Sequence, residues 1–413
     1  MSDILFRFIA RPGEAVSKTG EKLSCRIVYD GKVTAELYYG YRAEPLILSA
    51  EALPGDIIEI RIFSPVIRLY VNGTLFDEEW PAGERYLSDD PVFEGNLEIQ
   101  VLPCPDEEKT PLRSGIPTSE IRLPGVHIGD CMPFSDDSGG DFHLFYLYDR
   151  HHHASKWKLG AHTWAHVSTR DLKTWEEYPK ALDITEEWEG SICTGSVFAS
   201  EENGRPVYYA WYAVRTLSRV PRPITYAKSY DLIHFEKSGE SFFLPDVYDK
   251  FSARDPLVFY AKGKYHILVT TSRTSDGSGC LAHLSNEALS AAGWTDEGPI
   301  MAWADLVGID DPTAKEQPEC PDCFRMGDYY YLVFSIEGVA RYGYSTDPCG
   351  GWIYPENNTV PCGAVPKSAV LPSTGERIFM GFLGEGDYAG ALCAAKAKQN
   401  GDGTLAFESI ELL

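Results

Sequence analysis

Three short segments of the chain carry carboxylates beside residues that could support catalysis. They read His127-Ile128-Gly129-Asp130-Cys131, Ser252-Ala253-Arg254-Asp255-Pro256 and Gln317-Pro318-Glu319-Cys320-Pro321-Asp322. Hydrolysis of a glycosidic bond needs one carboxylic acid to protonate the leaving oxygen and one carboxylate to attack the anomeric carbon or activate water. A third, ionised carboxylate can stabilise the positive charge of the transition state, and Arg254 could keep Asp255 ionised. The segments predict Asp130, Asp255 and Glu319 as working carboxylates.

The alternative for each carboxylate alone is a turn or cap residue, because Asp and Glu are common in both. What favours chemistry is that each segment lies just ahead of a strand rich in aromatic residues. We therefore expect all three carboxylates at the same phase of a repeat, at one mouth of a shared channel.

The repeat consists of strands rich in Tyr, Phe and Leu. Five runs follow this pattern: Phe142 to Tyr146, Val207 to Trp211, Tyr265 to Val269, Tyr329 to Val333 and Ile378 to Phe382. Four of them are followed by a strand that ends in Ser, a turn and an aromatic residue, as at Ser168 and Trp175. Units of about 40 to 60 residues of this kind are typical of propellers. Residues 120–413 are therefore predicted to form a five-bladed β-propeller whose aromatics pack between blades.

The first 105 residues alternate apolar and polar side chains over short runs, as in Ile57 to Phe63 and Ile67 to Val71. Asn72-Gly73 between two such runs indicates a hairpin, because both residues tolerate positive φ. A small β-sandwich over residues 1–105 is the natural closure for such strands. The polar, Pro-interrupted stretch 106–119 is predicted to be a linker, and the fold class is all-β.

The charge excludes some partners. A formal net charge of −24 is the reverse of what a nucleic-acid binder needs, so a neutral ligand such as an oligosaccharide or polysaccharide fits better.

The N-terminus lacks the apolar core of a secretory signal, and no apolar run has the length of a membrane span. Ten scattered cysteines favour reduced thiols, so we expect a cytoplasmic protein.

Residues from about 120 to 400 resemble glycoside hydrolase family 32, the invertase, inulinase and levanase family, and the segment from Gly125 to Phe198 carries the resemblance best. The similar residues are His143 to Tyr146, Gly160 to His166, Ser168 to Glu177, Pro179 with Ala181-Leu182, and Thr194-Gly195-Ser196. Arg254-Asp255-Pro256 and Glu319-Cys320-Pro321-Asp322 are similar to the Arg-Asp-Pro and Glu-Cys motifs of that family.

The resemblance implies a retaining mechanism with Asp130 as nucleophile, Glu319 as general acid/base and Asp255 as transition-state stabiliser. It also implies carboxyl groups of Asp130 and Glu319 about 5 to 5.5 Å apart. The substrate-side residues that it implies are Arg254, Trp164, His162, Thr194 and Cys320. Cys320 would tune the surroundings of the acid rather than react.

Several neighbours of the carboxylates depart from the family pattern. Gly129 stands where the family has a sugar-contacting Asn, Leu147 where it has Gln, and Cys193-Thr194 where it has Phe-Ser. These changes remove polar partners for a fructosyl unit. The substrate is therefore expected to be a β-fructofuranoside or a related furanoside, and sucrose is expected to be a poor substrate. The β domain also precedes the propeller, whereas family members carry theirs after it.

Two other motifs are assigned no ligand. Three consecutive histidines, His151 to His153, cannot all point at one ion, and Cys320 with Cys323 lacks the second Cys pair of a zinc site. No metal or cofactor is expected. Two functions compete with hydrolysis: transfer of the same glycosyl unit to a sugar acceptor, and carbohydrate binding without turnover.

Overall fold

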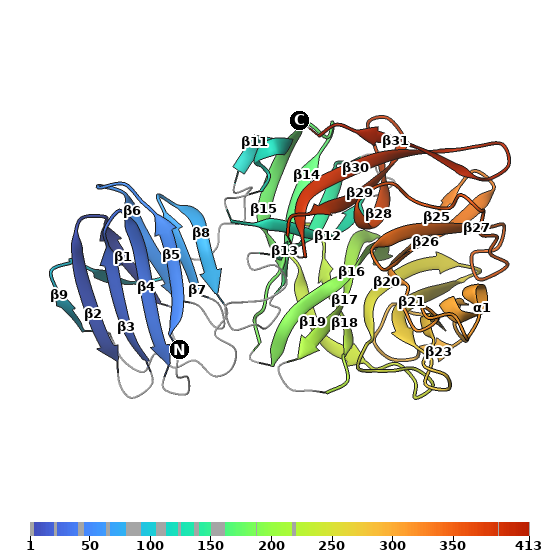
Figure 1. The fold of residues 1–413 in the computed structure, drawn as a ribbon, viewed down its shortest axis with the longest axis horizontal. Coiled ribbons are helices and arrows are strands. Elements are labelled where there is room, and N and C mark those ends of the chain that lie inside the picture. Colours follow the sequence, from blue (N-terminus) through green and yellow to red (C-terminus); the bar gives the residue numbers. More distant parts are fainter. Residues whose placement is uncertain are drawn as a thin grey trace.

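The computed structural model describes residues 4–19, 23–39, 45–62, 67–79, 92–104, 113–122, 125–135, 140–149, 162–186, 188–216, 220–386 and 388–412 (Figure 1). The regular structure in these ranges is almost entirely strand. Its helices are the 3-10 turn Thr118–Glu120 and α1 (Trp303–Val307). None of the described helices has the length and apolarity needed to cross a membrane. The prediction of an all-β fold is confirmed.

Two five-stranded sheets form the N-terminal unit within the described residues, drawn in blue to teal in Figure 1. In sheet order they comprise β10 (Gln100–Pro103), β1 (Ile4–Ile9), β6 (Ile57–Ile62), β7 (Ile67–Val71) and β8 (Thr74–Glu79), and then β5 (Leu46–Glu51), β4 (Lys32–Tyr39), β3 (Leu23–Tyr29), β2 (Gly13–Thr19) and β9 (Phe93–Gly95). Alternate side chains of both sheets meet in one apolar core. Asn72 and Gly73 take φ of 50° and 81° in the predicted β7–β8 hairpin. The sheets therefore make the predicted sandwich.

The strands from β12 onward form five blades in the described part of the chain. Blades I and II comprise β12 (His127–Phe134), β13 (Phe142–Asp149), β14 (Thr163–Thr169) and β15 (Thr174–Leu182), then β16 (Glu189–Glu202), β17 (Arg205–Thr216), β18 (Ile224–Ser229) and β19 (Glu236–Phe242). Blade III comprises β20 (Arg254–Ala261), β21 (Lys264–Ser272), β22 (Gly279–Asn286), β23 (Thr295–Asp296) and β24 (Met301–Ala302). Blades IV and V comprise β25 (Glu319–Met326), β26 (Tyr329–Ile336) and β27 (Val339–Ser345), then β28 (Ala364–Leu371), β29 (Glu376–Gly384), β30 (Gly390–Gln399) and β31 (Leu405–Ile410).

The blades close into a ring. The first strands of successive blades, β12, β16, β20, β25 and β28, contact one another in that order, and β28 contacts β12 again. The predicted aromatic runs are the second strands of the blades, and their side chains fill apolar clusters between neighbouring blades. Trp211, for example, is fully buried between blades II and III. Because burying one such side chain contributes about 1.5–3 kcal/mol, these clusters hold the ring together.

The predicted linker differs from the structure in its second half. Residues 105–112 lie outside the described residues, but β11 (Arg113–Pro117) pairs with β15 at the outer edge of blade I. Ile116 is buried there, and the Thr118 hydroxyl donates to the carbonyl oxygen of Leu172 at 2.8 Å. The stretch was expected to be a linker because it is polar, yet an edge strand needs only one buried face.

Candidate active site

A pocket of about 660 Å³ opens at the starts of the five innermost strands. This size is typical of pockets that bind small molecules. Its lining includes Asp130, Asp255 and Glu319, which lie on strands of three different blades. Ring closure therefore brings together carboxylates that are far apart in the sequence. Asp130 and Glu319 are separated by 189 positions.

Each of the five innermost strands carries a β-bulge where it meets the pocket, so that two of its residues oppose one residue of the second strand. A bulge re-aims side chains, so it is suited to turning a strand residue into a site. In blades III, IV and V the first bulge residue has positive φ and precedes a proline: Asp255 at 54°, Cys320 at 51° and Val365 at 40°.

The bulges correct the prediction that the three carboxylates share one phase. Glu319 is the last paired residue before its bulge, Asp255 is the first residue of its bulge, and Asp130 is the second. Cys320, not Glu319, occupies the position equivalent to Asp255. The prediction was wrong because a bulge adds a residue to one strand, and the spacing of apolar residues does not reveal where.

Asp130 is held by donors from three other blades. The Tyr388 hydroxyl donates to its Oδ1 at 2.8 Å, and Thr194 Oγ1 and Cys320 Sγ both donate to its Oδ2, the thiol at 3.5 Å. Burial raises the pKa of Asp130, and the charge of Asp255 raises it further, while the three donors lower it. The donors fix the carboxylate in one orientation and stabilise its ionised form.

Asp255 lies deeper, with 4% of its surface exposed. Its Oδ2 accepts the backbone N–H of Cys320 at 3.0 Å and lies 3.7 Å from Arg254 Nε. These two contacts bring a backbone donor and a guanidinium to a carboxylate that has little access to water. The backbone amide and the guanidinium therefore fix the position of this carboxylate.

Glu319 is the most accessible of the three, with 38% of its side chain exposed. Its Oε1 accepts Arg254 Nη2 at 2.8 Å. Partial burial raises the pKa of Glu319, the Arg254 guanidinium lowers it, and the charges of Asp255 and Asp130 raise it again. A raised pKa favours a carboxyl group that holds a proton for donation.

Arg254 is itself fixed on both sides. Its Nη1 donates to the carbonyl oxygen of Ser252 at 3.0 Å and to the side chain of Gln317, whose amide in turn donates to Ser272 at 2.7 Å. The guanidinium thus joins Asp255 to Glu319 and has little freedom to swing toward a ligand.

The other residues predicted on the substrate side divide into two groups. His162, Thr194 and Cys320 line the pocket together with Arg254. Trp164 does not: it is fully buried, and its indole N–H donates to the carbonyl oxygen of Cys193 at 2.9 Å. The prediction for Trp164 is therefore wrong, because its ring packs between blades I and II and supports the bulge that carries Thr194.

Tyr388 is a site residue that the sequence did not suggest. It lies between β29 and β30, and pairing of Ile128 with Gly390 brings this connection beside Asp130. A side-chain carbon at Gly129 would lie only 2.5 Å from the Tyr388 hydroxyl. The tyrosine therefore occupies the space left by the missing side chain at position 129. The only sign of it in the sequence was that Gly129 departs from the family pattern.

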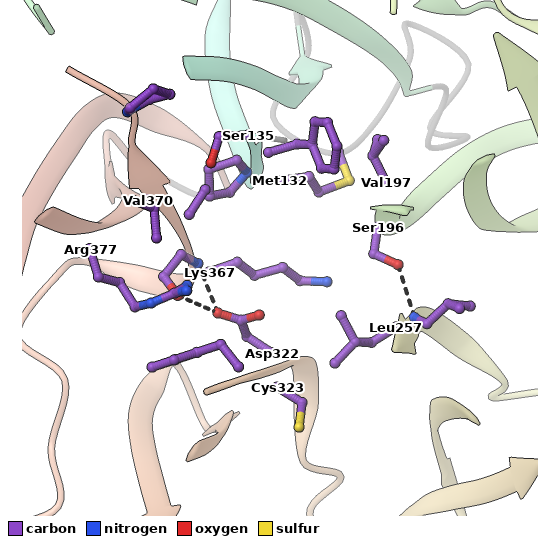
Figure 2. A pocket seen from close by; sticks show the side chains of 17 residues that line it. Met132, Ser135, Ser196, Val197, Leu257, Asp322, Cys323, Lys367, Val370 and Arg377 are labelled. Atoms are coloured by element: carbon purple, nitrogen blue, oxygen red, sulfur yellow. Dashed lines mark hydrogen bonds between the residues drawn. The ribbon is translucent and has the colours of Figure 1, made fainter. Parts of the chain in front are cut away.

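A second cavity of about 440 Å³ lies farther along the same innermost strands (Figure 2). Asp322, the last residue of the Glu-Cys motif, points into it and accepts the backbone N–H and the hydroxyl of Ser368, at 2.9 and 2.7 Å. The buried Lys367 donates to the carbonyl oxygen of Gly195 at 2.7 Å and so ties blade V to blade II. Asp322 and Lys367 hold inner strands together and do not line the first pocket.

Two groups of side chains in the described residues have the proximity that a metal ion needs. The ligand atoms of Asp130, Asp255 and Cys320 lie within 4.8 Å of one another, as do those of His266, His283 and Cys349. In the first group, hydrogen bonds already hold both carboxylates. In the second, His266 Nδ1 and His283 Nε2 are 2.8 Å apart, in direct hydrogen-bond contact. The three predicted loop histidines, His151 to His153, lie outside the described residues.

The known proteins that this chain resembles point to one family. The chain is 28% identical over 239 residues to sucrose-6-phosphate hydrolase of Zymomonas mobilis, a match that covers 54% of this chain and 44% of that protein. It is 29% identical over 233 residues to sucrose-6-phosphate hydrolase of Escherichia coli, covering 54% and 45%. The chain thus spans less than half the length of these curated relatives.

The fold agrees with solved propeller structures. Fructan 1-exohydrolase IIa of Cichorium intybus superposes with a TM-score of 0.56 at 18% identity, over 74% of this chain and 62% of the plant protein. The family model for the glycosyl hydrolases family 32 N-terminal domain matches residues 135–360, more than half of the chain. With this match beside the ring of five blades and the pocket at its mouth, the chain belongs to glycosyl hydrolase family 32.

Proposed function

We propose that the protein hydrolyses the glycosidic bond of a β-fructofuranoside or a related furanoside, with retention of configuration. The observation that carries the proposal is the set of three carboxylates in one pocket with three different environments. Asp130 is oriented by donors, Asp255 is buried beside Arg254, and Glu319 is partly exposed with a raised pKa.

In the first step, Asp130 attacks the anomeric carbon and forms a covalent glycosyl ester while Glu319 gives its proton to the leaving oxygen. In the second step, Glu319 takes a proton from water, the hydroxide attacks the same carbon, and Asp130 leaves as a carboxylate. Asp255 would accept hydrogen bonds from sugar hydroxyls and stabilise the positive charge that develops.

The relatives support the substrate class. Two matched proteins are named sucrose-6-phosphate hydrolase, and sucrose contains a β-fructofuranosyl bond. Leu147 lines the pocket, and the Tyr388 hydroxyl fills the space beside Gly129, so fewer side-chain polar groups face a fructosyl unit here. Each unpaired hydroxyl costs about 1–3 kcal/mol, so unmodified sucrose is expected to be a poor substrate.

The test compares the wild-type protein with Asp130→Asn and Glu319→Gln on a panel of sucrose, sucrose 6-phosphate, fructans and arabinofuranosides. Turnover of the best substrate should fall by at least about a hundredfold in both variants. Because burial raises the pKa of Asp130, its ionised form destabilises the fold above that pKa, so Asp130→Asn should melt no lower than wild type.

Asp328→Asn is the matched control, since Asp328 is exposed in the turn between β25 and β26 and should retain full activity. Product NMR would report the configuration, and chromatography would separate hydrolysis from transfer to an acceptor. Near-normal turnover by either active-site variant, or an inverted product, would refute the mechanism.

A further inference from the structure

Two arginines of blade II line the active-site pocket beside the carboxylates. Arg215 lies near the end of β17, and Arg222 lies just before β18, so both belong to the same hairpin. Neither has a role in the mechanism above. Both face the same space as Glu319.

The side chains of these two arginines have no hydrogen-bond or ion-pair partner among the described residues, in contrast to Arg254. Arg215 Nε is buried without any acceptor. An orphaned buried donor of a charged group is costly, so its retention points to an acceptor that arrives with a ligand. The backbone at Arg222 is fixed, because its N–H donates to the carbonyl oxygen of Lys250 at 2.9 Å.

The charges around Arg222 agree with this interpretation. Burial lowers the pKa of Arg222, the charges of Arg254 and Arg215 lower it further, and the charge of Asp255 raises it. Three guanidinium groups therefore lie close enough to interact, although the whole chain has a formal net charge of −24. An anion bound between Arg215 and Arg222 would relieve their mutual repulsion.

We propose that Arg215 and Arg222 form a subsite for a phosphoryl group carried by the sugar substrate. The inference rests on the proposed function and narrows its substrate class to phosphorylated furanosides. A phosphate monoester carries a charge of about −1.5 to −2 at neutral pH and three acceptor oxygens. Two guanidinium forks match both this charge and this number of acceptors better than they match a carboxylate or neutral hydroxyls.

The first experiment compares sucrose 6-phosphate with sucrose, which differ only in the phosphoryl group. The wild-type protein should have a higher kcat/KM for the phosphorylated sugar. Arg215→Gln and Arg222→Gln should each raise KM for that sugar about tenfold or more, the loss expected for a charge-assisted hydrogen bond, and change kcat/KM for sucrose less than about threefold. Equal losses on both sugars would overturn the proposal.

Arg205→Gln is the control for the change in net charge. Arg205 is exposed at the opposite end of β17, with its guanidinium 5.6 Å from the ring centre of Tyr230. Arg205→Gln should leave kcat/KM for both sugars unchanged. Arg222→Lys keeps the charge but not the planar fork, so it should fall between wild type and Arg222→Gln. Melting temperatures of all variants would identify any loss of fold.

The second experiment does not depend on turnover. Calorimetric titration with inorganic phosphate should show binding to the wild-type protein that weakens about tenfold in Arg215→Gln and Arg222→Gln and not in Arg205→Gln. If the wild type hydrolyses neither sugar, the proposed function fails while this titration still decides the subsite. Absence of phosphate binding, or binding that both variants retain in full, would overturn it.

Discussion

The three carboxylates of the pocket differ mainly in what donates to them. Asp130 has hydroxyl and thiol donors, Asp255 has a backbone amide and a guanidinium, and Glu319 has one guanidinium contact. Asp130 and Glu319 thus have different surroundings, and the proposed mechanism assigns attack to the first and proton donation to the second.

We expect the Arg254 contact to set the alkaline limit of activity. In the proposed mechanism Glu319 must be protonated in the first step, so activity should be lost as pH rises through its pKa in the folded protein. Arg254 lowers this pKa. In Arg254→Met, the alkaline limb of kcat/KM should therefore move to higher pH, even though the maximal rate falls.

A pH profile of kcat/KM measures this shift, with Arg325→Met as a control at an exposed arginine of β25. An unmoved limb in Arg254→Met would show that Glu319 is not the group that titrates.

Tyr388 is expected to affect the acidic limb of the pH profile. Its hydroxyl donates to Asp130 and lowers the pKa of that carboxyl group, which the proposed mechanism requires to be ionised. Tyr388→Phe should raise the pKa of Asp130, so the acidic limb should move to higher pH, with a fall in kcat of about tenfold or more.

The exposed Tyr230 provides the control substitution Tyr230→Phe. A fall in kcat without a shift of the acidic limb would assign Tyr388 a purely structural role, because loss of packing alone does not change the titration of Asp130.

At the scale of elements, local patterns were predictable and registers were not. The aromatic runs mark the second strand of each blade because apolar periodicity is a local property of the chain. The bulges depend on how two strands pair, so the phase of Glu319 relative to Asp255 was predicted incorrectly. Trp164 was misplaced for a related reason, since its motif fixed its strand but not which side of the blade its ring would face.

Contacts between distant segments were harder still. Tyr388 lies 258 residues from Asp130, and no spacing connects the two. The orphaned donor of Arg215 is likewise a property of packing. By contrast, motifs in the sequence mark Asp130, Asp255 and Glu319 as candidates, and the structure places all three in one pocket.

Gly195 tests how closely the bulge of blade II is packed. A side-chain carbon at this position would lie 1.8 Å from the carbonyl oxygen of Trp211, on the paired strand β17. Gly195→Ala should therefore separate the two strands, destabilise the protein by about 1–3 kcal/mol and displace Thr194 from Asp130.

The free energy of unfolding, measured by chemical denaturation, and kcat should both decrease in Gly195→Ala. Gly350→Ala is the matched control, because nothing lies within 4 Å of the corresponding carbon there. Stability within about 0.5 kcal/mol of wild type for Gly195→Ala would contradict this account of the bulge.

At the scale of the whole molecule, ion pairs join the sandwich to blade I. Lys180 Nζ lies 2.8 and 2.7 Å from the two carboxylate oxygens of Glu78, and Arg68 Nε donates to the same carboxylate at 3.1 Å. Arg68 also contacts Asp183. Burial lowers the pKa of Lys180, and the charge of Glu78 opposes this. One carboxylate of the sandwich therefore faces the buried Arg68 and the partly buried Lys180.

Glu78→Gln should weaken this junction. The substitution keeps the size of the side chain but leaves Arg68 and Lys180 with less compensation, which for buried pairs costs about 3 kcal/mol. Urea denaturation should show the loss, and limited proteolysis should release the sandwich sooner. The exposed Glu94 serves for a control, Glu94→Gln. A change below about 0.5 kcal/mol would show that the junction depends on other contacts.

Ring closure also has a consequence for biosynthesis. Asp130 is synthesised early and Tyr388 late, and the strand β28 that closes the ring against β12 begins only at Ala364. At about 5–20 residues per second, the 258 residues between Asp130 and Tyr388 take on the order of 10 to 50 s to translate. During that time the nascent chain holds Asp130 without its blade V partner. A chain released before the β29–β30 hairpin would carry all three carboxylates and still lack the site they form.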